Sequence, residues 1–227
     1  MDRGELKLYG AWASPYVLHV RLALKLKGLD YDYVEENLAN KSAALLRLNP
    51  VHRKVPVLLH GDRPIAESAA ILEYIDETWP RRFPLMPADP RERAAVRFWC
   101  HFAADKMIPS LIAILRSADE AQRAAAVGEV RENLELLEDE LREGFFRGRR
   151  FFGCEKLGFL DIVLGVDAHF LRGVTEVAEV DLGEDFPSFT SWLREFEAQP
   201  EVQEVLPPSD TIVDFLRGYR RRILAQA

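Results

Sequence analysis

Four prolines lie close together between Pro80 and Pro90 and divide the sequence into two parts with different hydrophobic patterns. Before them, short apolar or alternating runs typical of strands mix with helical patterns in the order βαβ, α, ββα. Beyond them, apolar residues recur at helical spacing almost to the end of the chain. Because closely spaced prolines favour a stiff, extended connection, we predict an α/β domain over residues 1–80, a linker over residues 81–90 and an all-α domain over residues 91–227.

Hydrophobic periodicity also predicts the individual elements. In the first part, we expect strands over residues 6–9, 31–35, 55–59 and 64–65, and helices over residues 15–27, over residues 41–48 and from about residue 68. In the second part, we expect helices near residues 96–114, 120–143, 159–172, 187–199 and 209–224. Pro109 lies inside the first of these helices and should kink it, because proline removes a backbone hydrogen bond.

Composition and charge limit the partners that the chain could bind. The chain has 30 Lys and Arg residues and 37 Asp and Glu residues, which give a formal net charge of −7. This balance argues against nucleic acid and membrane surfaces, which are bound mainly through clustered basic side chains. The sequence shows no secretory pattern, and no apolar run approaches the ~18 residues that cross a bilayer. The two cysteines, Cys100 and Cys154, lack metal-site spacing, so we expect a soluble cytoplasmic protein without a metal.

Ser14 and Pro15 stand directly before a helical pattern. A serine at the N-cap accepts a backbone amide hydrogen bond, and a proline at the first helical position loses no bond that it needs. A purely structural capping role is therefore one interpretation of Ser14.

Three further features favour a binding site. Val55-Pro56 begins a predicted strand, where a proline is awkward unless its peptide bond is cis. Glu67-Ser68 stand where the next helix begins, so free backbone amides there could hold a carboxylate. Lys41 and Lys54 lie in the loops between and could pair with a second carboxylate. Together with Ser14, these residues predict a pocket for a small peptide with two acidic groups.

Three stretches of the sequence resemble the plant tau-class glutathione transferases in order and spacing: WASPYVLHVRLALKLKGL, NKSAALLRLNPVHRKVPVLLHGDRPIAESAAILEYIDETW and FFGCEKLGFLDI. The resemblance implies a thioredoxin-like N-terminal domain, an all-helical C-terminal domain and a homodimer. It implies an enzyme that conjugates its co-substrate glutathione to small hydrophobic electrophiles, with peroxidase activity towards organic hydroperoxides. It also implies a role in detoxification and the stress response.

The resemblance assigns roles to the residues of the predicted pocket. Ser14 would be the catalytic serine. The glutathione contacts would be Lys41 and Lys54 at the glycyl end, Val55 at the peptide backbone before cis-Pro56, and Glu67 and Ser68 at the γ-glutamyl end.

A serine suits this chemistry because the thiolate of glutathione is its nucleophile. A free thiol titrates near ~8.5, and lowering its pKa by two units requires about 2.7 kcal/mol of selective thiolate stabilisation. A hydroxyl that donates to a charged acceptor supplies roughly 1.5–3 kcal/mol, and a helix N-terminus adds about 0.3–1 kcal/mol. A cysteine at residue 14 would instead form a mixed disulfide with glutathione.

The electrophile is expected where the two domains face each other, because such clefts are mostly apolar. Six side chains are predicted to line this site: Trp12, Tyr16, Met107, Leu111, Phe170 and Phe215. Core packing is the alternative for each of them, since apolar stripes at helical spacing usually face inward. A non-catalytic carrier of hydrophobic metabolites, a ligandin, is the alternative function for the same cleft.

Several residues have other interpretations. Asp167 and His169 depart from the tau pattern, which commonly has apolar or aromatic residues there, and together with Pro109 they are expected to reshape the electrophile site. Asp161 opens a predicted buried helix, which favours a capping and folding role. Cys154, in a glycine-rich turn, is expected to be exposed.

Overall fold

A computed structural model describes residues 5–182 and 185–225 and divides the chain into an N-terminal unit, Met1–Met86, and a C-terminal unit, Pro87–Ala227. The division falls within the segment 81–90 that was predicted as a linker, but the N-terminal unit runs past residue 80. Residues of this extension are bound to the unit, because Asp76 accepts the backbone N–H groups of Leu85 at 2.8 Å and Met86 at 3.0 Å. The guanidinium of Arg82 likewise donates to the carbonyl of Lys27 at 2.9 Å.

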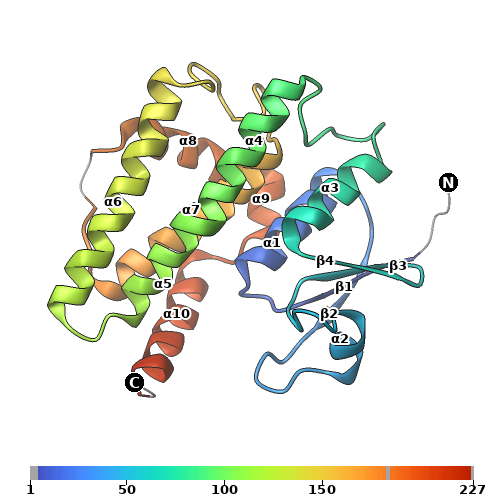
Figure 1. The fold of residues 1–227 in the computed structure, drawn as a ribbon, viewed down its shortest axis with the longest axis horizontal. Helices are drawn as coiled ribbons and strands as arrows, with labels where there is room; N and C mark the ends of the chain where they lie inside the picture. The colour runs from blue at the N-terminus through green and yellow to red at the C-terminus, as the bar shows by residue number, and fades with distance from the viewer. Residues whose placement is uncertain (1–4, 183–184, 226–227) are drawn as a thin grey trace. The chain divides into compact units, whose positions relative to one another are not determined.

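The N-terminal unit is a four-stranded sheet with three helices (Figure 1). The sheet order is β2-β1-β3-β4, with β1 parallel to β2 and antiparallel to β3, and β3 antiparallel to β4. Helices α1 and α3 pack together, while α2 lies on the other side of the sheet in Figure 1. The elements are β1 Leu6–Gly10, α1 Pro15–Leu26, β2 Asp32–Glu35, α2 Ala43–Leu48, β3 Val57–His60, β4 Arg63–Ala66 and α3 Ser68–Thr78.

Several of these elements differ at their ends from the sequence prediction, and β3 and α2 show why. Strand β3 begins at Val57 rather than at Val55, since Pro56 has no N–H to give to the ladder. Helix α2 begins at Ala43 rather than at Lys41, because Ser42 is its N-cap and its hydroxyl accepts the N–H of Leu45 at 3.0 Å. Strand β4 tolerates Pro64 because it is an edge strand that pairs only with β3.

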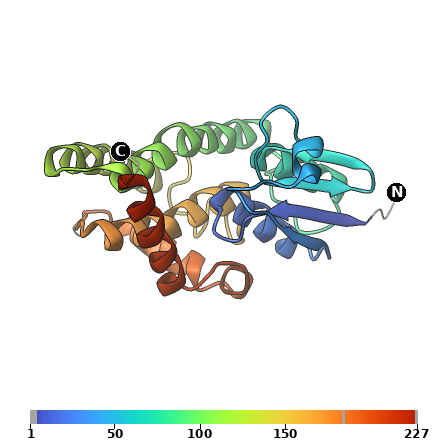
Figure 2. The same cartoon turned by 90° about the horizontal axis from the view of Figure 1, so that it is seen from below.

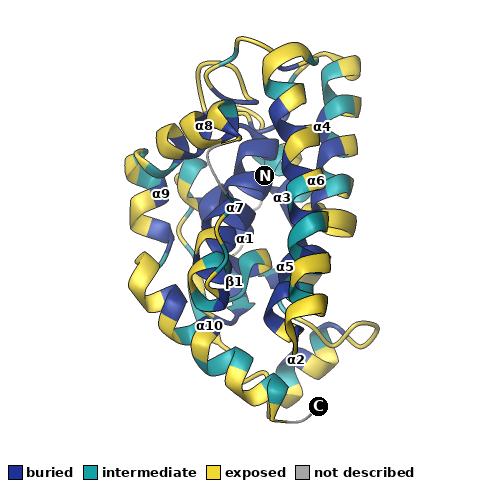
Figure 3. Ribbon diagram, turned by 90° about the vertical axis from the view of Figure 1, so that its left-hand side faces the viewer, coloured by how far each residue is buried: buried dark blue, intermediate teal, exposed yellow. Residues whose placement is uncertain are grey.

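The C-terminal unit is helical and is built around α7, in which every residue from Phe159 to Leu171 is buried (Figure 3). The helices α4, α5, α8 and α10 all contact α7. Burial on nearly all sides explains why apolar residues dominate the circumference of α7, in which Asp161, Asp167 and His169 are the buried polar residues between Phe159 and Leu171. The elements are α4 Pro90–Phe102, the π-helical turn η1 Ala103–Met107, α5 Ile108–Arg116, α6 Glu120–Glu143, α7 Phe159–Ala178, α8 Pro187–Glu197, α9 Pro200–Val205 and α10 Ser209–Leu224.

The helices α7 and α8 end at other residues than predicted. Helix α7 continues six residues beyond Arg172, to Ala178. Gly173 lies in this added part, where α10 comes so close that a Cβ would sit 2.9 Å from Leu216 Cδ1. The predicted helix 187–199 ends at Glu197, and Pro200 opens the separate helix α9, because proline suits the first position of a helix.

Pro109 acts through the turn that precedes it. The π-helical turn η1 joins α4 to α5, and the N–H of Ile108 bonds to the carbonyl of Ala103, five residues earlier. Pro109 follows at the start of α5, where its missing N–H breaks no bond. The structure thus has a widened turn directly before Pro109, and the kink itself stays a prediction.

The helical segment Pro90–Arg116 corrects one expectation from the sequence. Figure 2 shows α4, η1 and α5 as one continuous segment of 27 residues, whose most apolar window has a mean hydropathy of 1.3. By length and composition this segment is able to cross a membrane. It contacts α6 and α7, however, and the core helix of a soluble protein passes the same test. No apolar run of this length stands out in the sequence, because charged residues such as Asp105 and Lys106 interrupt it.

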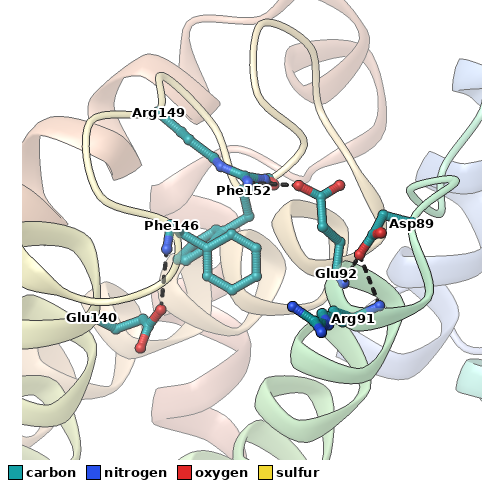
Figure 4. A network of polar contacts seen from close by, with 7 residues as sticks. All are labelled: Asp89, Arg91, Glu92, Glu140, Phe146, Arg149 and Phe152. Atoms are coloured by element: carbon teal, nitrogen blue, oxygen red, sulfur yellow. Dashed lines mark hydrogen bonds and ion pairs between the residues drawn. The ribbon is translucent and has the colours of Figure 1, made fainter.

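Arg149 ties the loop after α6 to the first turn of α4 (Figure 4). Its guanidinium bonds to the carboxylate of Glu92 at 2.7 Å and lies over the rings of Phe145 and Phe146. Asp89 caps the same turn by accepting the N–H of Glu92 at 3.0 Å. These contacts hold the loop that leads into the buried helix α7.

Candidate functional site

Ser14 occupies the N-cap position of α1, yet its hydroxyl makes no capping hydrogen bond. The backbone does the capping, because the carbonyl of Ser14 accepts the N–H groups of Val17 and Leu18, each at 3.0 Å. The N–H of Ser14 bonds to the carbonyl of Ala11 at 2.9 Å and closes a tight turn. The interpretation of the Ser14 hydroxyl as a helix cap is therefore wrong, and this half-buried group is not used by the helix that it opens.

Glu35 at the end of β2 holds the loop that carries Ser14. One carboxylate oxygen accepts the N–H of Trp12 at 3.2 Å, and the other accepts the hydroxyl of Tyr33 at 2.8 Å. Burial, together with this hydrogen bond to Glu35, raises the pKa of Tyr33. Gly10 allows the close approach here, because a Cβ at this residue would lie 2.5 Å from Val17. No sequence pattern points to Glu35. Tyr33 lies on the same strand, and the pairing of β2 with β1 brings the segment that carries Trp12 to Glu35.

The register of the sheet brings three predicted segments to one edge. Tyr9 pairs with Val57, and Val57 pairs with Ala66. The chain therefore leaves β1 towards Ser14, enters β3 from Val55-Pro56 and leaves β4 towards Glu67-Ser68 at the same edge of the sheet. The Val55-Pro56 peptide bond is cis, the isomer that the sequence analysis expects.

Glu67 precedes α3 with an unusual backbone conformation. Its φ of 73° lies in the left-handed region, which is rare for a side chain other than glycine. Its side chain does not cap α3, although its carbonyl accepts the N–H of Ile71 at 2.8 Å. The first N–H groups of a helix have no partner within the helix. The carboxylate of Glu67 is exposed and lies 3.9 Å from Nε2 of His52. Strained residues of this kind cluster at ligand sites.

The Lys41 side chain, from the segment before α2, reaches the loop between α2 and β3 that carries Lys54. The Lys41 ammonium donates to the carbonyl of Arg53 at 2.9 Å, which leaves two of its three donors. Lys54 is exposed, and its carbonyl accepts the side-chain amide of Asn49 at 3.0 Å. No sequence pattern assigns a role to Asn49, so its contacts are a finding of the structure.

The six side chains predicted for the electrophile site have different environments. Trp12 and Tyr16 are each 37% exposed. Phe215 is half-buried and stacks on Tyr219. The other three predicted residues, Met107, Leu111 and Phe170, are buried, which favours the core-packing alternative for them.

Asp161 is fully buried and accepts four hydrogen bonds. Its Oδ1 accepts the N–H of Phe152 at 3.0 Å and the indole N–H of Trp192 at 2.9 Å, and its Oδ2 accepts the N–H groups of Gly153 and Gly158, each at 2.8 Å. Burial raises the pKa of Asp161 to about 6, although the four hydrogen bonds act to lower it. The carboxylate thus joins the 151–158 loop to α7 and α8, which is a structural role.

His169 and Asp167, the departures from the tau pattern, are both buried in α7. His169 contacts the Glu197 carboxylate through Nδ1 at 3.2 Å and the Pro207 carbonyl through Nε2 at 3.0 Å. Partial burial acts to raise the pKa of Glu197, but the hydrogen bond with His169 and the charge of Arg172 outweigh it and lower that pKa. His169 therefore has structural partners on α8 and on the connection between α9 and α10.

The remaining predictions concern Cys154 and metals. Cys154 is exposed, in a turn where its φ is 73°. Over residues 5–182 and 185–225, no three His, Cys, Asp or Glu side chains are grouped so that they could hold a metal ion.

Known proteins with the same architecture identify the family. The family model for the glutathione S-transferase N-terminal domain matches residues 4–77, and the model for the C-terminal domain matches residues 120–195. Glutathione transferase GST 23 from Zea mays is 46% identical, with 97% of each chain covered. Glutathione S-transferase U16 from Arabidopsis thaliana is 43% identical over 100% of this chain and 98% of its own.

Solved structures agree with these relatives. The tau-class glutathione S-transferase from mango superposes with a TM-score of 0.88 at 40% identity, covering 97% of this chain and 98% of its own. Rice GST1, solved in complex with glutathione, gives a TM-score of 0.90 at 34% identity, covering 98% and 99%. The N-terminal unit is thus a thioredoxin-like domain, followed by a helical domain. The chain belongs to the glutathione S-transferase family, among the plant tau-class enzymes, and is a glutathione transferase.

Proposed function

We propose that this transferase binds glutathione at the sheet edge shared by Ser14, Val55-Pro56 and Glu67-Ser68, and that the Ser14 hydroxyl donates a hydrogen bond to the glutathione sulfur. One observation carries the proposal: the hydroxyl stands at the start of α1 without capping it. A donor in that position favours the thiolate over the thiol, and the positive end of the helix dipole adds to the effect. The hydroxyl itself keeps its proton.

The two acidic ends of the tripeptide find matching groups along this edge. The uncapped amides of α3, together with Ser68 and Glu67, would hold the γ-glutamyl end, whose ammonium suits the Glu67 carboxylate. Lys41 and Lys54 would hold the glycyl carboxylate as charged donors. Val55 would pair with the peptide backbone. The complex of rice GST1 with glutathione supports glutathione as the co-substrate.

The electrophile is a small hydrophobic molecule, with organic hydroperoxides as a second class. The exposed rings of Trp12 and Tyr16, on either side of Ser14, support this proposal, because aromatic surface near the thiolate would bind such molecules. The same two rings would serve a carrier of hydrophobic metabolites equally well. The family also supports a cytoplasmic homodimer that acts in detoxification and the stress response.

Replacing Ser14 tests the catalytic proposal. Ser14→Ala should leave glutathione binding largely intact and reduce turnover of an aromatic halide by roughly one to three orders of magnitude, the worth of one charge-assisted hydrogen bond. Ser191→Ala, at an exposed serine of α8, is the matched control and should keep full activity. Near-normal turnover in Ser14→Ala would remove Ser14 from the mechanism. Tight binding of a hydrophobic dye by the unaltered protein, without turnover, would favour the carrier.

A further inference from the structure

Asn49 makes four hydrogen bonds at the end of α2. Its N–H donates to the carbonyl of Leu45 at 2.9 Å, and its own carbonyl accepts the N–H of Arg53 at 2.9 Å. Its side chain accepts the N–H of His52 through Oδ1 at 3.1 Å and donates through Nδ2 to the carbonyl of Lys54 at 3.0 Å. Asn49 is only 4% exposed. A single buried side chain thus spans the loop that follows it.

The loop from Val51 to Lys54 has little else to hold its shape. All four of its side chains are exposed, and Val51 is 82% exposed, so the loop is not fixed by apolar burial. Arg53 has a φ of 54°, a left-handed conformation that costs an ordinary side chain free energy. The polar contacts of Asn49, together with the bond from Lys41 to the Arg53 carbonyl, are what fix this conformation.

We infer that Asn49 is a positioning residue for glutathione, a role that rests on the proposed function. It touches none of the reacting atoms. By fixing the Lys54 carbonyl, Asn49 sets the backbone position from which the Lys54 side chain extends and the direction in which the chain continues into Val55. Both residues belong to the proposed glycyl and backbone contacts of glutathione. Ser14 lies on a different segment, after β1, so the thiolate contact does not depend on Asn49.

This separation predicts a particular pattern in the kinetics. Asn49→Ala should raise the KM and the Kd for glutathione about five- to thirty-fold, the equivalent of one or two lost hydrogen bonds. The kcat at saturating glutathione and the KM for an aromatic halide should change less than about two-fold, because uniform binding is lost rather than transition-state stabilisation. The backbone N–H groups of His52 and Arg53 should exchange faster with solvent in the variant without glutathione.

Two further variants distinguish positioning from general destabilisation. Asn133→Ala makes the same change at another buried asparagine, which donates to Ser110 in the C-terminal unit, and it should leave the glutathione KM unchanged. Asn49→Asp keeps the volume and the acceptor for His52 but turns an oxygen towards the Lys54 carbonyl. It should raise the glutathione KM at least as much as Asn49→Ala, and it carries the test if Asn49→Ala does not fold.

The measurement is calorimetric titration of the unaltered protein and each variant with glutathione, alongside steady-state kinetics. Absence of glutathione binding in the unaltered protein would reject the proposed function itself. Binding in the unaltered protein with an unchanged Kd in both Asn49 variants would overturn the inference alone. An equal rise of KM in Asn133→Ala would also overturn it, since the effect would then follow stability rather than the loop.

Discussion

Asp161→Asn tests how strongly the buried carboxylate holds the C-terminal unit together. The side chain accepts two N–H groups on each oxygen. An asparagine of the same size keeps one oxygen but presents an NH₂ group to the other two donors, which then have no acceptor. Each buried donor left unpaired costs about 1–3 kcal/mol, so we expect the free energy of unfolding to fall by about 2–6 kcal/mol.

Urea denaturation measures this loss. With a slope of about 2 kcal/mol per M, the expected change lowers the midpoint of unfolding by about 1–3 M. Far-ultraviolet circular dichroism and tryptophan fluorescence should be followed together, and coinciding curves justify a single free energy. Trp192 reports on the site directly, because its indole is one of the four donors.

Asp119→Asn is the matched control. Asp119 also accepts a backbone N–H at a helix start, that of Gln122 at 2.8 Å, but this bond is exposed. Asparagine is as good an N-cap as aspartate, so the same chemical change should shift the midpoint by less than about 0.3 M. If Asp161→Asn behaves like this control, the four contacts do not carry the stability assigned to them.

Two other sets of variants test the packing and the charges of α7 and its neighbours. Gly165→Ala should lower the free energy of unfolding by about 1–3 kcal/mol, because its Cβ would lie 2.4 Å from the ring of Phe196. Gly128 of α6 is the control, because a Cβ added there would have nothing within 4 Å. Gly128→Ala should raise the free energy of unfolding by about 0.5–1 kcal/mol, since alanine favours a helix over glycine. Equal effects of the two substitutions in urea titrations would refute the packing argument. The pKa of Glu197 is lower in the folded protein than in the unfolded chain. Its pairing with His169 therefore stabilises the fold fully above the unfolded pKa of about 4.3. This stabilisation is lost as the pH falls through the pKa of Glu197 in the folded protein. The stability advantage over Glu197→Gln should therefore be smaller at about pH 3.5 than at about pH 5.5, and an advantage that grows on acidification would contradict the assignment.

Much of the fold follows from local patterns in the sequence. The mixed and helical parts, the helix after Ser14-Pro15 and the α6 range Glu120–Glu143 were predicted because helical periodicity and capping act over a few residues. The structure differs from these predictions, or favours the other interpretation, where a neighbour distant in the sequence decides. The N-terminal unit continues to Met86 because Asp76 binds the chain there, and three predicted electrophile residues are buried within the fold.

The candidate site shows the same division. The residue types at 14, 41, 54–56 and 67–68 predicted a pocket for a doubly acidic peptide without reference to the fold. The arrangement of residues 14, 55–56 and 67–68 at one sheet edge, however, depends on the pairing of Tyr9 with Val57 and of Val57 with Ala66. The hydrogen-bonding partners of Glu35 and Asn49 likewise became identifiable only in the structure.

By itself, the sequence determined the two-part organisation and the starts of several helices, such as α1, α3 and α6, and it predicted the chemical character of the proposed glutathione site, because capping and helical periodicity act over a turn or two. Only the tertiary structure decided that the Ser14 hydroxyl is not used as a helix cap, that Asn49 spans its loop and that Asp161 joins three segments. Hydrogen bonds of this kind form between groups that strand register and helix packing bring together, and no local pattern records which groups will meet.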